Sequence, residues 1–352
     1  MKGELHRTLF QKKLLAWYHR NKRTLPWRES QNPYHIWVSE IILQQTRVAQ
    51  GLPYYQRFIE VFPNVQALAK ASQQDVLRLW QGLGYYSRAR NMHACAQQVV
   101  KEYGGQFPSA YQELLQLKGI GPYTAAAIAS IAFNQPHAVV DGNVFRVLAR
   151  VFGIDTNIAG PEGKKLFTAK ANELIDEKQP GDFNQAMMEL GATCCTPQNP
   201  QCTVCPFEKF CHAYTTDSVD LFPVKSKKVK IRQRHFHYFV LGWRNKVALR
   251  QRSGSDIWNG LFEFYLVETA QPQAVAQIIL ADSWLRSLPA QPAVVHPPVK
   301  HVLTHQHLQV SFYEWPLAAK VPLPPGMAWH NKTEAEALPK PVVITRFLDE
   351  CL

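Results

Sequence analysis

The spacing of apolar residues changes about two thirds of the way along the chain. From Leu5 to about Ala213, apolar residues recur three and four positions apart, which is the pattern of helices that bury one face. Proline and glycine interrupt this pattern, as at Phe107-Pro108 and Gln179-Pro180-Gly181, and such interruptions indicate helix boundaries. We therefore predict that the first part of the chain is all-α.

Beyond residue 234 the pattern becomes that of strands. Aromatic and β-branched residues gather in four runs separated by turns, which is typical of β-structure. We expect one helix near Gln273–Ala281 and another near Ile344. The second part is therefore predicted to be a small α/β or α+β unit. The four runs are HFHYFVLGW (235–243), KVALRQR (246–252), GLFEFYLVE (260–268) and HLQVSFYEW (307–315).

A basic segment separates the two parts. Residues 217–234 contain little that fills a core, and their cations are Lys225, Lys227, Lys228, Lys230, Arg232 and Arg234. This composition predicts a solvated linker, either a simple tether or a strap that contacts phosphates. The predicted domains are therefore 1–216 and 235–352, joined by the linker 217–234.

The overall charge is strongly basic. Lysine and arginine exceed aspartate and glutamate by 12 in 352 residues, which suits nucleic acid, acidic lipid or simply a soluble cationic protein. The N-terminal stretch MKGELHRTLFQKKLLAWYHR mixes charges with apolar residues, unlike a signal peptide or a membrane span. We expect a cytoplasmic protein that does not bind membranes.

Cysteines cluster in one short stretch. In a cytoplasmic protein disulfides are rare, so clustered cysteines point to a metal or an iron–sulfur cluster. The segment has one Cys-x-x-Cys pair with an outlying cysteine on each side, whereas a zinc ribbon usually has two such pairs. This spacing favours iron–sulfur over zinc. The predicted ligands are Cys195, Cys202, Cys205 and Cys211, and Cys194 is expected to be a buried spare.

Two glycine hairpins indicate a grip on phosphates. Gly119-Ile120-Gly121 precedes Pro122, a residue suited to the first turn of a helix, whose N-terminus exposes N–H groups to an anion. A tight corner without a ligand is the alternative. The similar hairpin Gly82-Leu83-Gly84 is followed by Arg88 and Arg90, and two such hairpins favour binding to a nucleic-acid backbone.

Three motifs in order resemble those of the helix-hairpin-helix DNA glycosylases that carry a [4Fe–4S] cluster. They are LKGIGPYTA (117–125), VVDGNVFRVLAR (139–150) and the four-cysteine stretch. LPWRESQNPYHIWVSEIILQQTRV (25–48) and GLGYYSRARN (82–91) resemble the MutY branch, the adenine DNA glycosylases. That family ends in a Nudix-like domain, which the strand-rich second part resembles.

The resemblance implies fold, substrate and cofactor together. It implies a six-helix barrel with a helix-hairpin-helix, a [4Fe–4S] subdomain built from the N-terminal helix and residues of about 136–216, and an α+β Nudix-like domain. The implied enzyme removes adenine paired with 8-oxoguanine or guanine in double-stranded DNA. We expect it to act as a monomer and, in a bacterial cell, at the nucleoid.

Base excision needs an acid for the leaving base and an anion beside the sugar cation. Glu40 lies among apolar residues of a predicted helix, where its pKa is expected to rise so that it can donate a proton. The alternative is that Glu40 lies on the one solvent-exposed stripe of a core helix. Asp141 is placed to cap a helix, and the resemblance makes it the carboxylate that stabilises the cation or bonds to the sugar. Asn143 is implied to orient it.

Tyr123 bears on strand cleavage. The resemblance places it where strand-cleaving relatives carry a lysine that forms a Schiff base, and a phenol cannot form one. We therefore expect a glycosylase with weak or no lyase activity, in which Tyr123 orients Asp141 or the sugar. Lys118 is the nearest lysine in the sequence.

The target adenine must leave the duplex before it is cut. The resemblance assigns Gln44, Gln45 and Tyr85 to the wedge that fills the gap, although glutamines on a helix surface and a core tyrosine are the plain alternative. Arg28 and Gln185 are further polar candidates without an assigned role.

The second domain is predicted to recognise the lesion. Its segment RSGSDIWNGLFEF (252–264) resembles a Nudix sequence, but no acidic run follows Glu268, so no magnesium site is expected. The resemblance aligns Leu303, Thr304 and His305 with a Phe-Ser-His loop that reads oxidised guanine. Two other functions fit the charge and domains: a nucleotide hydrolase with a DNA-binding appendage, and a non-catalytic DNA-binding protein with a structural cluster.

Overall fold

The computed structural model describes residues 2–226, 231–289 and 291–351. They fall into two compact units, Met1–Lys70 with Asn91–Lys227 and Ala71–Arg90 with Lys228–Leu352. The domain boundaries expected from the sequence stay a prediction. Of the predicted linker, Lys227, Lys228 and Lys230 lie outside the described residues.

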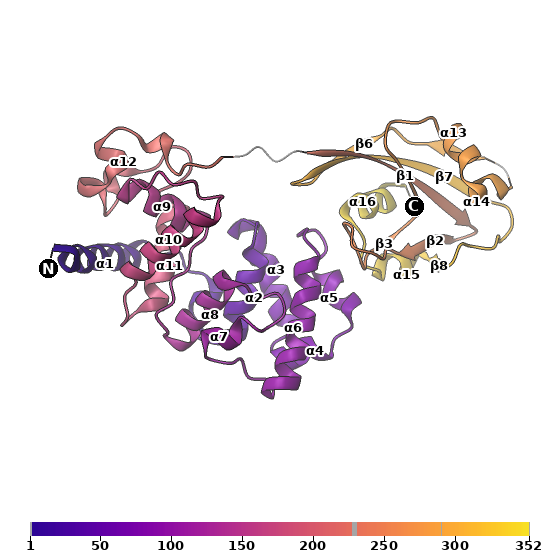
Figure 1. The fold of residues 1–352 in the computed structure, drawn as a ribbon. Helices are drawn as coiled ribbons and strands as arrows, with labels where there is room; N and C mark the ends of the chain where they lie inside the picture. Colours follow the sequence, from indigo (N-terminus) through magenta and orange to yellow (C-terminus); the bar gives the residue numbers. More distant parts are fainter. Residues whose placement is uncertain (1, 227–230, 290, 352) are drawn as a thin grey trace. The chain divides into compact units, whose positions relative to one another are not determined.

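The chain is helical up to Thr215, which confirms the all-α prediction (Figure 1). Short 3₁₀ turns connect several of the helices. The α-helices are α1 (Lys2–Asn21), α2 (Pro33–Leu43), α3 (Val48–Val61), α4 (Val65–Lys70), α5 (Gln73–Leu79), α6 (Ser87–Tyr103), α7 (Tyr111–Leu114), α8 (Pro122–Phe133), α9 (Gly142–Phe152), α10 (Pro161–Leu174), α11 (Pro180–Thr193) and α12 (His212–Thr215); the 3₁₀ turns are η1 (Pro26–Arg28), η2 (Cys202–Val204), η3 (Glu208–Phe210) and η4 (Val219–Leu221).

Local sequence explains where the helices around the site begin and end. Asn32 caps α2 by accepting a hydrogen bond from the Tyr34 N–H, and proline occupies the first position. Asp141 caps α9 in the same way, and Gly153 ends that helix in the left-handed conformation that glycine adopts without strain.

Helices α1, α9, α10 and α11 of the first unit contribute to one core. Helix α11 packs against α1, α8 and α9, while α10 contacts α1 and α9. Phe10 of α1 stacks on Phe207 of the cysteine-rich segment, with ring centroids 4.3 Å apart, so this segment is tied to the helical core. Helix α2 packs against α3 and α8, which brings α2 beside the start of α8.

The second part of the chain, within its described residues, forms one mixed sheet of eight strands. The order is β3-β2-β1-β7-β5, with β4 paired to β1, β6 to β7 and β8 to β2; only the long pair β1 and β7 is parallel. The elements are β1 (Arg232–Trp243), β2 (Lys246–Gln251), β3 (Phe262–Glu263), β4 (Tyr265–Thr269), α13 (Val275–Ala281), α14 (Ser283–Ser287), β5 (Val294–Val295), β6 (Val299–Val302), β7 (Gln306–Leu317), β8 (Met327–Asn331), α15 (Lys332–Ala337) and α16 (Val342–Cys351).

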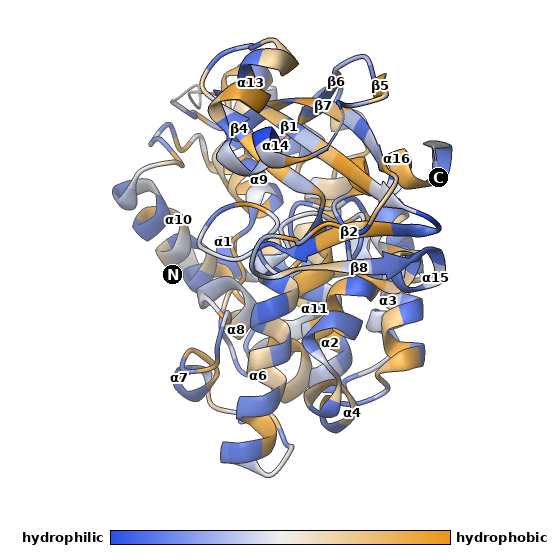
Figure 2. Cartoon of the chain, turned by 90° about the vertical axis from the view of Figure 1, so that its right-hand side faces the viewer, coloured by the Kyte–Doolittle hydropathy of each residue, from blue (hydrophilic) through white to orange (hydrophobic). Residues whose placement is uncertain are grey.

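Helices cover both faces of this sheet (Figure 1). On one face, Phe239 and Trp315 pack with residues of α13 and α14. On the other, Phe312 of β7 stacks on Phe347 of α16 with centroids 4.2 Å apart. The alternation of side chains along each strand supplies both layers, and the strands in Figure 2 accordingly show orange hydrophobic segments between white and blue ones.

The α+β prediction is confirmed, with differences in detail. The run 260–268 is split into β3 and β4, because its middle residue Phe264 leaves the ladder and is fully buried against α16. Strands β5, β6 and β8 and helices α14 and α15 were not expected. Prolines at 297 and 298 separate β5 from β6, and each strand is too short to show alternation.

Candidate active site and cysteine loop

Glu40 lies on α2, a helix buried on nearly all sides. The side chain is only 8% exposed, and the Tyr123 hydroxyl donates a hydrogen bond to its Oε2 at 2.6 Å. Burial raises the pKa of Glu40 to about 7, although the bond from Tyr123 and the charge of Arg28 act in the opposite direction. A large share of this carboxyl is therefore protonated at neutral pH.

Asp141 is held at the start of α9. Its Oδ1 accepts from the Val144 N–H and its Oδ2 from the Asn143 side-chain amide, both at 2.8 Å. Burial raises the pKa of Asp141 above its ordinary value, and these hydrogen bonds and the nearby Arg146 reduce that rise without cancelling it. Both oxygens thus have donors that favour the ionised form.

Glu40, Tyr123, Asp141 and Asn143 line one cavity of about 170 Å³ in the first unit. Glu40 and Asp141 come from positions about a hundred residues apart, and the packing of α2 on α8 and of α8 and α9 on α11 brings them together. Tyr123 differs from expectation, because its hydroxyl donates to Glu40 rather than to Asp141. A proton donor and a carboxylate therefore face the same space.

Glu189 is a third acid of this cavity, and the sequence analysis missed it. It is fully buried on α11 and accepts hydrogen bonds from Arg23 and Arg28, each at 2.7 Å. Burial raises the pKa of Glu189, but the hydrogen bonds from the two arginines outweigh burial and lower it to about 2. Arg28 and Gln185, unassigned from sequence, also line the cavity. The sequence signal for Glu189 was an acid within the apolar stretch 186–192 of α11.

The predicted cysteine ligands surround a second cavity, which Cys194 also lines. Cys195 follows α11, Cys202 begins η2, and Cys211 precedes α12. Within the described part of the chain, no three Cys, His, Asp or Glu side chains lie close enough to hold a single metal ion. In a cubane cluster each thiolate binds a different iron, so the sulfurs need to line a common cavity rather than meet at one point. Four cysteines around one cavity fit that requirement.

Two buried arginines of α9 contact this loop. Arg150 donates to the Cys195 sulfur at 3.5 Å and to the Thr196 carbonyl at 2.7 Å. Arg146 donates to the Cys195 carbonyl at 2.7 Å and to the Asn143 side-chain oxygen at 2.8 Å. Since Asn143 also bonds to Asp141, a continuous chain of hydrogen bonds runs from the acid cavity to the cysteine loop.

Comparison with known proteins decides the family. Residues 38–177 match the model of the HhH-GPD superfamily base excision DNA repair proteins, and residues 237–350 match that of the NUDIX domain. The adenine DNA glycosylase of Buchnera aphidicola subsp. Baizongia pistaciae is 33% identical, covering 97% of this chain and 96% of that protein. The human adenine DNA glycosylase is 36% identical over 93% of this chain and 71% of its own. The chain belongs to the adenine DNA glycosylase family.

Solved structures support the same fold. A thermostable thymine-DNA glycosylase is 29% identical with a TM-score of 0.55, covering 60% of this chain and 97% of that chain. A non-covalent endonuclease III–DNA complex gives a TM-score of 0.51 at 22% identity, covering 62% and 98%, and shows likeness of fold alone. As a member of the adenine DNA glycosylase family, the protein is a DNA N-glycosylase of base excision repair.

Two of the three wedge residues predicted for this adenine DNA glycosylase occupy unusual backbone conformations. Gln45 and Tyr85 have φ of 59° and 48°, in the left-handed region. Such a backbone costs about 1–3 kcal/mol for a residue other than glycine and is often found at functional sites. Tyr85 is 42% exposed, so it is not the core tyrosine of the alternative interpretation. Gln44 directly follows α2, and its side chain lies 3.5 Å from the Thr124 hydroxyl.

The hairpin glycines differ in the space around them. Gly119 has a φ of +76°, and a Cβ there would meet Asn91 at 2.7 Å, so only glycine fits. Gly121 precedes α8 with open space where a Cβ would stand. The second hairpin also has left-handed glycines, Gly82 and Gly84.

The turn of residues 303–305 connects β6 to β7 in the second unit. Thr304 and His305 are exposed at its tip, while Leu303 is half-buried. The Thr304 hydroxyl forms a hydrogen bond with the Tyr85 hydroxyl, which belongs to the same unit. Of the helices in the described part of this glycosylase, none is long and apolar enough to span a membrane.

Proposed function

We propose that this protein removes adenine paired with 8-oxoguanine or guanine from double-stranded DNA, by hydrolysing the N-glycosidic bond of a flipped nucleotide. The observation that carries the proposal is the shared cavity of Glu40, with its raised pKa, and Asp141, with both oxygens hydrogen-bonded. An acid and an anion in one site are what glycosidic cleavage requires.

Glu40 supplies the proton to the leaving base. Tyr123 occupies its Oε2, which leaves Oε1 to carry the proton towards the adenine ring. The bond between the base nitrogen and C1′ breaks, and its electron pair leaves with the protonated adenine. The ionised Glu40 then takes a proton from the water that adds to C1′, which regenerates the acid.

Asp141 supplies negative charge to the sugar. As C1′ loses the base it becomes cationic, and the carboxylate stabilises it by proximity or by a transient bond. The donors from Asn143 and the α9 backbone keep this carboxylate oriented and ionised. The cation beside Asp141 is therefore stabilised without movement of the protein.

No side chain of the cavity lining is suited to a Schiff base. The lysine of strand-cleaving relatives is replaced here by Tyr123, and the residues that line the cavity include no lysine. We therefore propose that the enzyme releases the base and leaves the strand intact, or cleaves it only weakly.

DNA is held by the two glycine hairpins, and Gln44, Gln45 and Tyr85 fill the gap left by the flipped adenine. The left-handed backbone of Gln45 and Tyr85 supports this role, because strained positions are retained where function needs them. Thr304 and His305, exposed on the 303–305 turn, read the oxidised guanine.

Cys195, Cys202, Cys205 and Cys211 hold a [4Fe–4S] cluster in the cavity they line. The cluster would cross-link the loop between α11 and α12 and fix its shape. Arg146 and Arg150 place positive charge beside Cys195, which favours the ionised form of that thiol.

A single-turnover assay tests the proposal. Purified protein is mixed with duplexes that contain A opposite 8-oxoguanine, A opposite G, or A opposite T, and released adenine is measured over time. We expect release to be fastest for 8-oxoguanine, slower for G and slowest for T. Glu40→Gln removes the proton donor and should slow release by about 10²–10⁴-fold.

Two results would contradict the proposal. Protein that binds the 8-oxoguanine duplex but leaves adenine attached would be a DNA-binding module rather than an enzyme. Release that is unaffected in Glu40→Gln and in Asp141→Asn would place the chemistry elsewhere.

A further inference from the structure

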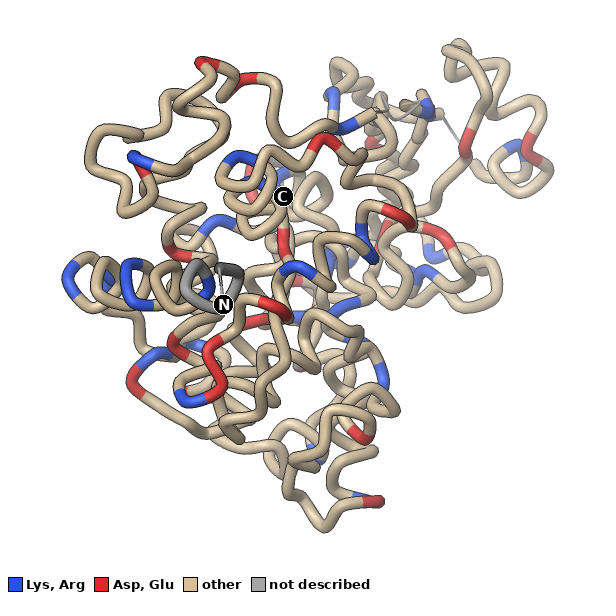
Figure 3. Tube along the Cα trace, turned by 60° about the vertical axis from the view of Figure 1, so that its left-hand side comes forward, with Lys and Arg blue, Asp and Glu red and all other residues tan. Residues whose placement is uncertain are grey.

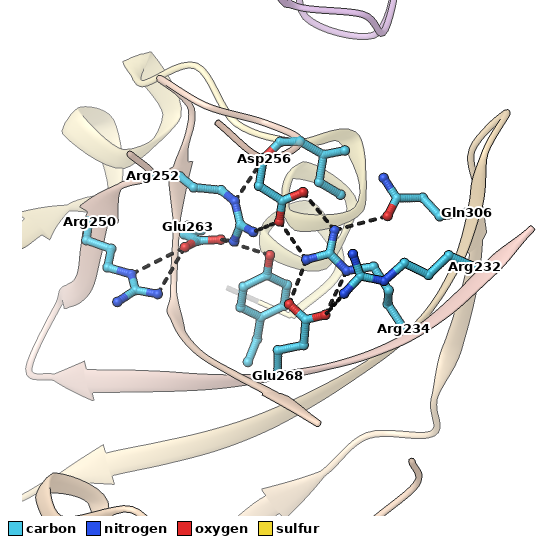
Figure 4. A network of polar contacts seen from close by, with 10 residues as sticks. Arg232, Arg234, Arg250, Arg252, Asp256, Glu263, Glu268 and Gln306 are labelled. Atoms are coloured by element: carbon cyan, nitrogen blue, oxygen red, sulfur yellow. Dashed lines mark hydrogen bonds and ion pairs between the residues drawn. The ribbon is translucent and has the colours of Figure 1, made fainter. Parts of the chain in front are cut away.

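Arg234 lies at the centre of a buried charge network in the sheet domain (Figure 4). Its side chain is 4% exposed, and it lies between the carboxylates of Asp256 and Glu268. It pairs with each of them through two hydrogen bonds, at 2.6–2.9 Å to Asp256 and 2.6–2.7 Å to Glu268. Its remaining N–H donates to the side-chain oxygen of Gln306 at 3.0 Å.

These bonds use every donor of the guanidinium. Arginine has five N–H groups in a rigid plane, and the five bonds of Arg234 account for all of them. A buried donor that loses its acceptor pays the full cost of desolvation. Gln306 is therefore held in place from the protein interior.

The network joins segments that are distant in sequence. Arg234 belongs to β1, Asp256 to the loop after β2, Glu268 to β4 and Gln306 to the start of β7. Gln306 directly follows the 303–305 turn, and its carbonyl accepts from the Leu303 N–H at 2.9 Å. The His305 carbonyl accepts from the Arg232 N–H at 3.1 Å. The turn is thus closed by the bond from Leu303 to Gln306, and its C-terminal side is tied through His305 and Gln306 to the stretch of β1 that carries Arg234.

The loop after β2 also contacts the hairpin formed by β6 and β7. Trp258 is only 7% exposed and has a φ of 62°, an uncommon conformation for a bulky residue, and its ring lies 5.6 Å from that of His301 on β6. Arg252 holds this loop by donating to Asp256 at 2.7 Å and to the Ile257 carbonyl at 2.9 Å. Asp256 therefore links the loop after β2 to Arg234.

Stability alone is a weak reason for such a network. Replacing a buried ion pair by apolar residues of similar volume is often neutral or stabilising, whereas charged networks restrict geometry. Arg234 also contacts Gln306, which directly follows the exposed turn between β6 and β7. Its position suits the control of turn geometry better than the filling of a core.

We propose that Arg234 and Gln306 are positioning residues, which hold the 303–305 turn in the shape that reads the base opposite the excised adenine. The inference rests on the function proposed above. Thr304 and His305 make the contact, and the buried network fixes where their side chains stand.

Gln306→Leu tests the inference, because it removes the acceptor for Arg234 and keeps both carboxylate pairs. The ratio of single-turnover adenine release from 8-oxoguanine and guanine duplexes is measured. Losing one hydrogen bond to a charged group should lower this ratio about tenfold. Gln306→Glu restores an acceptor and should keep the ratio within about threefold of wild type, which a purely structural role would not predict.

Gln309→Leu is the matched control. It makes the same substitution on the same strand at an exposed position outside the network, and the ratio should stay unchanged. Thermal unfolding of each variant shows whether the sheet domain remains folded; a lower ratio only in Gln306→Leu, measured at a temperature where both leucine variants are folded, supports positioning.

The outcomes separate the two proposals. Wild-type protein that prefers the 8-oxoguanine duplex, together with an unchanged ratio in Gln306→Leu, overturns this inference and leaves the proposed function standing. Wild-type protein that releases no adenine overturns the proposed function first. Wild-type protein that releases adenine equally from both duplexes overturns the inference, because the turn then reads nothing.

Discussion

The three acids of the cavity differ because their immediate partners differ. Glu40 has one hydrogen-bond donor in apolar surroundings, so burial dominates and raises its pKa to about 7. Glu189 is equally buried, but two arginines hold its pKa at about 2. Asp141 has donors on both oxygens. Residue type alone does not distinguish the proton donor from the ionised carboxylates. The number and charge of the groups that contact each carboxyl do.

The pH dependence of adenine release should follow Glu40. The protonated form is the acid, and the pKa of about 7 is raised from 4.5, so the active form predominates below pH 7. The single-turnover rate is expected to be level below about pH 6.5 and to fall towards tenfold per pH unit above about pH 7.5. Rates on the 8-oxoguanine duplex from pH 5.5 to pH 9 measure this.

Tyr123→Phe provides an internal check on the cause. The hydroxyl of Tyr123 stabilises ionised Glu40, so its removal should move the alkaline limb of the rate profile to higher pH by about one unit.

The free energy of unfolding should depend on the same carboxyl. Because the pKa of Glu40 is raised in the folded state, its contribution to stability is fully present below pH 4.5 and is lost as the pH rises through about 7. That loss is about 3 kcal/mol and should be absent in Glu40→Gln. An alkaline limb that is unchanged in Glu40→Gln would assign it to another group.

Helix α9 connects the acid cavity to the cysteine loop. Asp141 caps it, Asn143 lies in its first turn, and Arg146 and Arg150 follow at three- and four-residue spacing. This spacing lets one helix present the carboxylate at its start and two arginines to the loop. Because Arg146 bonds to Asn143 and to the Cys195 carbonyl, we expect the loop to influence the orientation of Asp141.

Arg146→Gln should therefore slow adenine release without abolishing binding of the proposed [4Fe–4S] cluster. It removes the donor to Asn143, while Arg150 still contacts the Cys195 sulfur. We expect the single-turnover rate to fall by about 10–100-fold, the range of one or two charged hydrogen bonds. Visible absorbance with iron and sulfide analysis measures the cluster in the same sample.

Arg286→Gln is the control, because Arg286 is an exposed arginine of α14 in the sheet domain. It should change neither the rate nor the absorbance. Arg146→Gln protein with wild-type rates would show that Asp141 keeps its orientation without the link to the loop.

Elements with local signals could be predicted from the sequence, and those held by distant contacts could not. Pro122 and Asp141 are local signals for the first turns of α8 and α9, so both helices were expected. Glu189 was missed because its partner Arg23 lies 166 residues away. The bond from Tyr123 to Glu40 joins positions 83 apart, and nothing local distinguishes it from a bond to Asp141.

At the scale of the whole molecule, the positive charge is unevenly distributed. Of the excess of 12 cations, 7 belong to residues 1–216, which include the lysines and arginines of α1 (Figure 3), 4 to the linker 217–234 and only 1 to residues 235–352. A basic protein on DNA displaces condensed counterions, so its affinity depends on salt irrespective of sequence. Catalytic specificity resides in few residues, whereas affinity is distributed over many.

Salt dependence of binding tests how much the described end of the linker contributes. Lys225 is an exposed cation in the segment between the helical and sheet domains, and we expect it to contact one phosphate. The logarithm of the association constant should fall linearly with the logarithm of salt concentration, and Lys225→Gln should reduce the magnitude of that slope by about one.

Fluorescence anisotropy on a labelled 8-oxoguanine duplex, from 50 to 200 mM salt, measures the slope of wild type and variant. Lys320→Gln serves as control, because Lys320 lies beyond the end of β7 opposite the 303–305 turn, over the ring of Trp243. Its slope should equal that of wild type. If Lys225→Gln also keeps the wild-type slope, this part of the segment is a tether that touches no phosphate, and the affinity comes from the folded domains.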